Sequence, residues 1–502
     1  MAVGKGLADV RTNIYDDVQP QYGTPTGVCA VIGHTTRGEI ATPTIIETVL
    51  QFTRTFGSVL VDGDFAHSCI IALEAGATLL VSRLVNYTVV GQVWTPTGIV
   101  ATSALASCRW RGTDGNSISI TIAAAVSGIA NKKDIFVTLD GVTESLRDVP
   151  ATLVLSDINA INARFTNVTF FTSLTSLADG TTTLSGGTNP TEPLAADYVG
   201  NSASATGVYS FDGYNGFDFI AAFGIAQNTV DIALSDYVTL RSDCNALLRT
   251  PTGLLGTEVV KYRKAIAPYA GTFINNWRAR MTTGGVKVAS KLNSTVVVQM
   301  SESPLYAAAL CRKNATGSVW LSVGAPRYSY LSRVIGVAQN FLGNGRKAEA
   351  DTVVNAGVVP IVQEQTGRVR IFGDSTMQMT HGFLQNANIA DTITYITNGV
   401  REIYNQFLFE PNDIPTWRHM HVQVMNFLKP IVDGGGIRAY AYKGDQDANS
   451  FASLTVNSVP DINEGQYKVI IEIFPTTVMK HIEISINLTA NLAVDVSVSS
   501  PN

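Results

Sequence analysis

Residues 389–428 read IADTITYITNGVREIYNQFLFEPNDIPTWRHMHVQVMNFL, and their apolar residues are spaced for two helices. In the first half of this stretch the apolar residues follow one another at intervals of four, three, four, three and four. This is the period of one buried helix face, so a strongly amphipathic helix is predicted over 389–407. The stripe consists of Ile389, Ile393, Ile396, Val400, Ile403 and Phe407.

A second helix is predicted over 414–428, after Pro411 has interrupted the helical pattern. Trp417 lies on its apolar side, and the helix is expected to end before Pro430 and the glycines at 434–436.

Three strands are predicted to follow, at Lys468–Phe474, His481–Leu488 and Leu492–Val498. The last strand has one apolar and one mostly polar face, so it needs a partner. It either forms a hairpin with the strand at 481–488 or is donated to a neighbouring molecule. Its apolar face consists of Leu492, Val494, Val496 and Val498.

The N-terminal part is predicted to be a β-α-α-β unit. Thr44 and Glu47 have the spacing of a capping box, which places the start of the first helix at Thr44. The four elements are expected at 28–32, 44–57, 64–76 and 78–84.

The middle of the chain changes character twice. Short alternating strands around Ile120 and Val137 predict a small β-sandwich, and the Thr/Ser/Gly-rich residues 175–190 are interpreted as a linker. Beyond this linker, strands alternate with helices, which is typical of an α/β layered domain. Its elements are expected at 234–248 (helix), 295–298, 359–362 and 369–372 (strands).

The composition excludes several classes of function. Only 15% of the 502 residues are charged, so much of the surface must be neutral and polar, as in a protein covered by copies of itself. A net charge of -5 argues against direct nucleic-acid binding. The N-terminus lacks a secretory signal, and the longest apolar stretch, 118–130, is too short to cross a membrane, so synthesis in the cytoplasm and no membrane insertion are expected.

The five cysteines are far apart and form no Cys-x-x-Cys pair, which predicts buried free thiols and leaves intermolecular disulfides open. They are Cys29, Cys69, Cys108, Cys244 and Cys311.

Motifs that suggest catalysis or metal binding lack the partner residues that such sites require. Ser375, in the sequence Gly-Asp-Ser-Thr at 373–376, has no Asp-x-x-His block downstream, so a turn is predicted there rather than a nucleophile. Asp445–Asn449 begins like a calcium loop but lacks its glycine and final glutamate, and His419 and His421 diverge on a helix. Gly343-x-Gly345 lacks the third glycine of a dinucleotide loop. No enzyme activity, cofactor or metal is expected.

Short motifs occur in a recognisable order along the chain. The N-terminal and middle ones are GVCAVIG at 27–33, RGTDGNS at 111–117 and NAGVVP at 355–360. The C-terminal ones are FLFEPN at 407–412, Trp417, NFL at 426–428, IRAY at 437–440 and DAN at 447–449. This order resembles the contractile bacteriophage (myovirus) tail sheath protein family over nearly the whole chain. The segment 299–304 departs from the family's Pro-rich pattern, and a basic pair is missing before Ile389.

The resemblance implies an α+β and α/β multidomain fold in which the middle domain is subtilisin-like without catalytic residues. The expected parts are an N-terminal arm (1–22), an α/β unit (23–100), a β-sandwich (101–182), the subtilisin-like sheath domain (183–378), an inner C-terminal domain (379–488) and an exchanged C-terminal strand (489–502).

The resemblance also implies a mechanical function in the contractile tail of a virion. Sheath subunits of the family stack as six-fold rings around a tail tube and contract to drive the tube through the host envelope. The implied partners are further copies of the chain, the tail tube protein, and baseplate and tail terminator proteins. The alternatives are the sheath of a tailocin or secretion-type injection system and a subtilisin-like hydrolase.

Two sets of residues are expected to contact other molecules. Val10 and Ile14, in an extended arm over 8–18, are expected to join the C-terminal strand in inter-subunit strand exchange; their four-residue spacing also permits a short helix. Because the family places its C-terminal domain innermost, the charged residues on the two helices are expected to face the tube, with solvated helix faces as the alternative. They are Arg401, Glu402, Arg418 and Lys429.

Deleting residues 491–502 tests the donated strand. Without the strand, the subunit should stay folded and soluble but should no longer polymerise, since the inter-subunit backbone hydrogen bonds are lost. Negative-stain microscopy of the purified variant checks this. Full-length tubes formed by the truncated protein would contradict the prediction.

Overall fold

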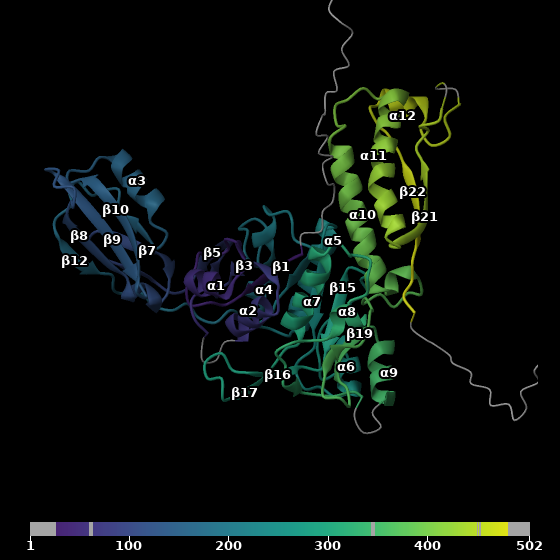
Figure 1. Cartoon of the computed structure of the whole chain (residues 1–502), viewed down its shortest axis with the longest axis horizontal. Helices are drawn as coiled ribbons and strands as arrows, with labels where there is room; N and C mark the ends of the chain where they lie inside the picture. Colours follow the sequence, from purple (N-terminus) through teal and green to yellow (C-terminus); the bar gives the residue numbers. More distant parts are fainter. Residues whose placement is uncertain (1–26, 60–63, 343–346, 449, 451–452, 480–502) are drawn as a thin grey trace, which may run out of the picture.

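The computed structural model describes residues 27–59, 64–342, 347–448, 450 and 453–479. Figure 1 shows three parts along the longest axis of the molecule: a β-rich part with β7–β10, a central α/β body, and a layer formed by two long helices and a two-stranded sheet. The predictions for 1–22, for Val10 and Ile14, for Gly343 and Gly345, and for both strands beyond 480 lie outside the described residues.

The central body is built on an eight-stranded sheet with the order β2-β3-β1-β13-β14-β15-β19-β20. The six inner strands are parallel, and the edge strands β2 and β20 are antiparallel to their neighbours. The bounds are β1 Val28–Gly33, β2 Thr44–Ile46, β3 Thr78–Arg83, β13 Phe219–Ala221, β14 Asn245–Arg249, β15 Ala279–Thr283, β19 Val358–Gln363 and β20 Val369–Ile371.

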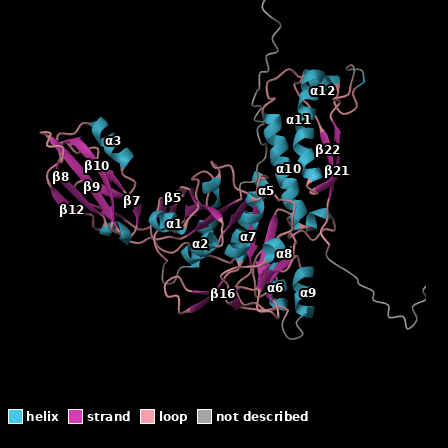
Figure 2. Ribbon diagram, in the orientation of Figure 1, coloured by secondary structure: helices cyan, strands magenta, loops and turns pink. Residues whose placement is uncertain are grey.

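Helices cover both faces of this sheet (Figure 2), which explains why β1, β13 and β19 read as largely apolar runs. Alternate residues of β1 belong to two separate cores: Cys29 and Val31 pack with one set of helices, and Ala30 and Ile32 with the other. The first set is α1 Val49–Phe56, α2 Asp64–Glu74 and α7 Ser303–Ala315. The second is α4 Ala195–Val199, α5 Asn228–Arg241, α6 Gly256–Arg263 and α9 Lys347–Asn355.

The β-rich part consists of two sheets that share one core, with the strand orders β10-β9-β8-β12 and β11-β7-β6. Ile120 and Val137 are fully buried between the sheets, as their alternation predicts. The bounds are β6 Val100–Thr102, β7 Ala106–Arg111, β8 Ser119–Ala124, β9 Lys132–Leu139, β10 Val142–Pro150, α3 Leu155–Arg164, β11 Val168–Phe170 and β12 Gly180–Thr183.

Smaller elements complete the body. They are the hairpin β4 Tyr87–Val90 and β5 Val93–Pro96, the sheet of β16 Val286–Ala289, β17 Val297–Met300 and β18 Gly336–Val337, and the short helix α8 Pro326–Ser329.

The C-terminal layer contains the two predicted helices. They are α10 Ala387–Asn405 and α11 Ile414–Asp433, followed by β21 Ile437–Lys443, the short helix α12 Val459–Asn463 and β22 Ile470–Pro475. Asp413 caps α11, since its side chain accepts a hydrogen bond from the backbone N–H of Thr416 at 2.9 Å.

Four predicted elements differ from the structure. The first helix starts at Val49 with Thr48 as its cap, because residues 44–46 form β2 instead. The helix predicted over 234–248 ends at Arg241, and β14 begins at Asn245. Helix α11 continues through Pro430, whose missing N–H interrupts only its last turn. Residues 180–183 form strand β12 within the predicted linker, since their β-branched threonines pair with β8.

The predicted unit 23–100 and the predicted domain 183–378 share one sheet. Strand β1 pairs with β3 on one side and with β13 on the other, so backbone hydrogen bonds join the two ranges directly. Residues 28–32 are a continuous apolar run that is buried on both faces, and the sequence alone could not assign this strand to a larger sheet.

A buried ionic cluster joins α10 to the central body. Asp391, in the second turn of α10, accepts hydrogen bonds from Arg280 of β15 and from Nζ of Lys313 of α7, the latter at 2.7 Å. All three side chains are at most 2% exposed. Burial alone would raise the pKa of Asp391, but the charges of Arg280 and Lys313 hold it below its usual range. The neighbouring Asp374 is also buried, and burial raises its pKa despite the same two cations.

The substitution Asp391→Asn should lower the free energy of unfolding by about 3–5 kcal/mol at pH 7, because it leaves two cations buried without their carboxylate. The stabilisation by Asp391 is present above its unfolded pKa of about 4 and is lost as the pH falls through its lower folded pKa. The change at Asp374→Asn should stay within about 1 kcal/mol, since the raised pKa shows that its charge is not favoured in the fold. Scanning calorimetry measures both. A wild-type unfolding temperature for Asp391→Asn would contradict the role of the cluster.

Candidate interface on the C-terminal helices and sheet

Among the described residues, the C-terminal sheet consists of two strands. β21 and β22 pair antiparallel from Ile437 opposite Pro475 to Lys443 opposite Ile470, with an irregularity near Ile437. Within the described residues, no strand pairs with the second edge of β22. The N–H and C=O groups along this edge are therefore a template for a further strand.

A groove lies between this open edge and α10. Ile471 and Ile473 of β22 form one wall, and Ile393, Val400 and Tyr404 of α10 belong to the other, enclosing a volume of about 510 Å³. The apolar stripe of α10 is thus divided. Ile396 and Ile403 lie buried in the core of the C-terminal layer, whereas Ile393 and Val400 stay half-buried. The groove is an apolar surface beside unpaired backbone, which is the arrangement that accepts a strand with one apolar face.

A chain of tyrosines holds the groove in place. The hydroxyl groups of Tyr404 and Tyr442 are 3.1 Å apart, those of Tyr442 and Tyr467 are also 3.1 Å apart, and Tyr467 donates to the carbonyl of Gly444 at 3.0 Å. Burial, together with these contacts, raises the pKa of Tyr404 and of Tyr467. The chain connects α10 to β21 through neutral hydroxyl groups, so the groove wall does not depend on charge.

The FLFEPN motif forms the turn between α10 and α11. The side-chain oxygen of Asn412 accepts a hydrogen bond from Trp417 Nε1 at 2.9 Å, and its amide nitrogen donates to the carbonyl of Gln466 at 3.0 Å. Trp417 is fully buried and stacks on Tyr467. The motif therefore has a structural role, tying the helix pair to the segment before β22.

The loop that begins at Asp445 is filled by protein donors. Its carboxylate accepts hydrogen bonds from Thr455 and from the backbone N–H groups of Val456 and Asn457, at 2.7–3.2 Å. Burial would raise the pKa of Asp445, but these donors lower it well below its usual range. The polar turn expected in place of a calcium loop agrees with this geometry. Within the described ranges there is no group of three His, Cys, Asp or Glu side chains that could hold a metal ion.

The four charged residues predicted to face a tube do not form one cluster. Arg401 and Glu402 line a cleft between α10 and the central body, and Arg401 donates to Ser242 Oγ at 3.0 Å. Arg418 donates to the carbonyls of Gln446 and Ala448 and so holds a loop of its own chain. Lys429 is exposed.

The other predicted features are also located. Ser375, where a turn is predicted, instead forms an isolated antiparallel β-bridge with Asn386, next to the buried Asp374. His421 contacts the ring of Tyr442. All five cysteines are buried free thiols. In the part of the chain that the structure describes, no helix combines the length and the apolar character needed to cross a membrane.

The sequence pattern did not reveal the groove, because a residue of an apolar stripe looks the same whether its own chain or another molecule covers it. The stripe of α10 was predicted correctly, and the strand predicted at 468–474 corresponds to β22. The structure adds that, among the described residues, no strand beyond β22 covers this part of the α10 stripe.

Comparison with known proteins identifies the fold. No protein-family model matches the sequence, and no curated protein sequence matches it. Among solved structures, the chain is similar to the sheath tail protein from Listeria innocua, with 16% identity, a TM-score of 0.58, and 90% of this chain and 95% of that chain covered. The chain is also similar to the sheath tail protein from Desulfitobacterium hafniense, with 15% identity and a TM-score of 0.54; the match covers 87% of this chain and 94% of that chain. The match to the anti-feeding prophage helical sheath in its contracted state has 11% identity and a TM-score of 0.55, and it covers 97% of this chain and 100% of that chain.

Proposed function

We propose that this chain, which has the fold of sheath tail proteins, is the structural subunit of a contractile tail sheath. In this proposal it has no enzymatic activity and polymerises as stacked six-fold rings around a tail tube. Contraction of the rings drives the tube through the envelope of a host cell. Its partners are further copies, the tube, and the proteins at the two ends of the tail. A bacteriophage tail is the first candidate, in line with the sequence motifs, and a tailocin or secretion-type sheath is the second.

The open edge of β22 above an apolar groove is the observation that carries this proposal. A monomer gains nothing from leaving Ile393, Val400 and Ile473 half-covered beside unpaired backbone. A polymer gains stability from this arrangement, because a strand from another subunit can form backbone hydrogen bonds with β22 and fill the groove at the same time. Each such bond contributes only about 0.5–1.5 kcal/mol net, and apolar burial adds about 25 cal/mol per Å². A whole strand therefore links two subunits firmly.

The strand at 492–498 has the pattern that this groove requires. In the predicted strand its apolar residues, Leu492, Val494, Val496 and Val498, would share one face and match the apolar wall formed by α10. We assign the acceptor site for this strand to the edge of β22 in a neighbouring subunit. Val10 and Ile14 of the N-terminal arm are proposed to add to the same sheet.

The tube is proposed to contact the outer face of α11. Exposed residues recur there at intervals of four, three and four, which places them in one stripe on the helix. The stripe consists of Arg418, Val422, Met425 and Lys429, with Val422 54% and Met425 37% exposed. Of the charged residues predicted at the tube, Lys429 fits this face best. Arg418 contributes mainly by holding the loop at 446–448, and Arg401 and Glu402 face the central body instead.

The central sheet is proposed to be the subtilisin-like layer of the sheath fold without catalytic residues. Because β1, β3 and β13 share one sheet, the ranges 23–100 and 183–378 are expected to move together during contraction. The sandwich at 101–182, the inner part at 379–488 and the terminal segments 1–22 and 489–502 complete the subunit.

The substitution Ile473→Lys should prevent tube formation, because it places a charge in the apolar groove that the incoming strand must cover. Ile470→Lys is the matched control, since Ile470 lies on the opposite face of the same strand and is 50% exposed. Negative-stain microscopy should show tubes for the control and none for Ile473→Lys, with equal unfolding temperatures for the two proteins. Normal tubes formed by Ile473→Lys would rule out the groove as the acceptor site.

The substitution Lys429→Glu should weaken assembly of the sheath on the tube while empty sheath polymers still form. The effect should be modest, since an exposed ion pair contributes only about 0–1 kcal/mol, but it is repeated in every subunit. Lys261→Glu, on the exposed side of α6, makes the same charge change elsewhere. Co-sedimentation with purified tubes at low salt compares the two variants. Equal binding by both would remove Lys429 from the contact.

A further inference from the structure

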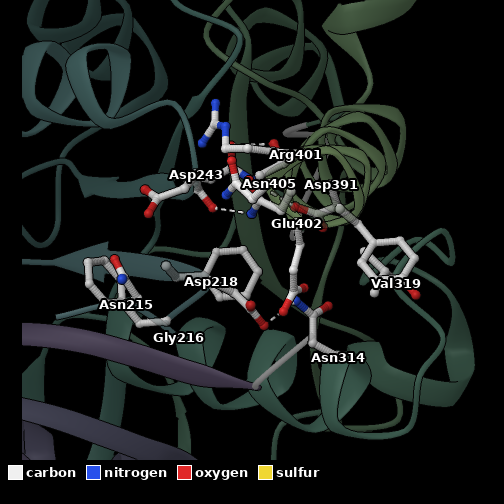
Figure 3. A pocket seen from close by; sticks show the side chains of 16 residues that line it. Asn215, Gly216, Asp218, Asp243, Asn314, Val319, Asp391, Arg401, Glu402 and Asn405 are labelled. Atoms are coloured by element: carbon white, nitrogen blue, oxygen red, sulfur yellow. Dashed lines mark hydrogen bonds between the residues drawn. The ribbon is translucent and has the colours of Figure 1, made fainter. Parts of the chain in front are cut away.

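A second cavity lies on the other side of α10, between this helix and the central body. It has a volume of about 570 Å³ and runs along α10 from Asp391 to Asn405. Fourteen residues of α-helix span about 21 Å. In Figure 3 Arg401, Glu402 and Asn405 lie across the cavity from Asn215, Gly216 and Asp218, which precede β13. We call this cavity the α10 cleft.

The α10 cleft is lined by an unusual number of amide side chains. Five asparagines contribute to it, from α10, from α7, from the segment before β13 and from the first position of β14; they are Asn215, Asn245, Asn314, Asn398 and Asn405. An asparagine offers two N–H donors and one acceptor oxygen, the same groups that an extended backbone presents. These amides suit a peptide backbone better than they suit an apolar ligand.

In two of these amides the side-chain oxygen accepts no hydrogen bond from the described residues. Asn314 is 3% exposed and donates through its Nδ2 to Asp218 Oδ2 at 2.8 Å, yet its Oδ1 has no hydrogen-bond partner among the described residues. Asn398 donates to the carbonyl of Asp243 at 2.7 Å, and its Oδ1 is equally without a partner within the described part of the chain. A buried acceptor left unpaired costs about 1–3 kcal/mol, so the cleft calls for donors such as backbone N–H groups.

The first described residue of the chain is tied to the same cleft. The backbone N–H of Gly27 donates to Asp218 Oδ2 at 2.9 Å, the oxygen that also accepts from Asn314. Gly27 is therefore fixed at the cleft. Six extended residues reach about 20–21 Å, which is the length of α10 that the cleft follows.

We propose that residues 21–26 (Gln-Tyr-Gly-Thr-Pro-Thr) of the same chain bind in the α10 cleft as an extended segment, with backbone N–H groups donating to Asn314 and Asn398. Pro25 favours this conformation, since it restricts Thr24 to the extended region. Attachment at Gly27 keeps the segment close to its site, so a second copy cannot compete with it at ordinary concentrations.

Hydrogen exchange of the full-length protein tests the proposal, and it does so on unassembled subunits, independently of sheath formation. Backbone amides of residues 21–26 should exchange slowly, at a rate that does not change with protein concentration. Asn314→Ala and Asn398→Ala should each speed this exchange about tenfold, which corresponds to the loss of one hydrogen bond. Asn463→Ala, at an exposed position of α12, is the matched control and should leave the exchange unchanged.

Each other outcome counts against the proposal. Exchange of residues 21–26 at the rate of an unstructured peptide would overturn it. Protection that grows with protein concentration would assign the cleft to a second copy instead. Protection that survives both asparagine substitutions would place the segment elsewhere on the protein. If Asn314→Ala does not fold, as judged by exchange in β1 and β13, Asn398→Ala decides, because Asn398 lies outside the sheet.

Discussion

The contact between Asp391 and the two cations Arg280 and Lys313 is the constraint on which the C-terminal half of the protein depends. It holds the start of α10 inside the central body, where water is excluded and a broken ion pair is costly. From that point the helix continues into the C-terminal layer without a break. Both surfaces discussed above, the groove toward β22 and the cleft toward the central body, are opposite sides of this one helix. The position of α10 therefore determines the geometry of both surfaces.

The sequence predicted the elements whose period was long and unambiguous. The helices α10 and α11 were predicted close to their observed bounds, and the alternation around Ile120 and Val137 corresponds to β8 and β9, because a stripe or an alternation over many residues leaves few alternatives. The errors occurred where a local signal competed with a tertiary contact. The pair Thr44 and Glu47 has the spacing of a capping box, but residues 44–46 pair with β3, and the cap is Thr48. Threonines 181–183 have the composition of a loop, yet they complete a sheet.

The candidate interface was predictable only in its components. The strand at 468–474 and the apolar stripe of α10 were both expected, but the uncovered groove between them follows from the number of strands beside β22, which no periodicity reports. The roles of the charged residues on the helices depend on contacts between segments distant in sequence. Arg418 is occupied by the carbonyls of a loop 28 to 30 residues further along the chain. Charge on a helix face therefore indicates exposure more reliably than it indicates a partner.

An open strand edge beside apolar surface is a hazard for a soluble subunit, and β22 limits that hazard by its construction. The edge is only six residues long, and the outward face of the strand carries Glu472, paired with Lys443 of β21 at 2.6 Å. A strand that merely forms backbone hydrogen bonds would leave Ile393, Val400 and Ile473 in contact with water. Only a strand with apolar residues at alternate positions is stabilised both by backbone hydrogen bonds to β22 and by burial of the apolar groove. In the proposed strand exchange, selectivity for the correct segment would thus arise from the α10 side of the groove rather than from the edge itself, and the buried cluster that fixes the position of α10 would maintain it.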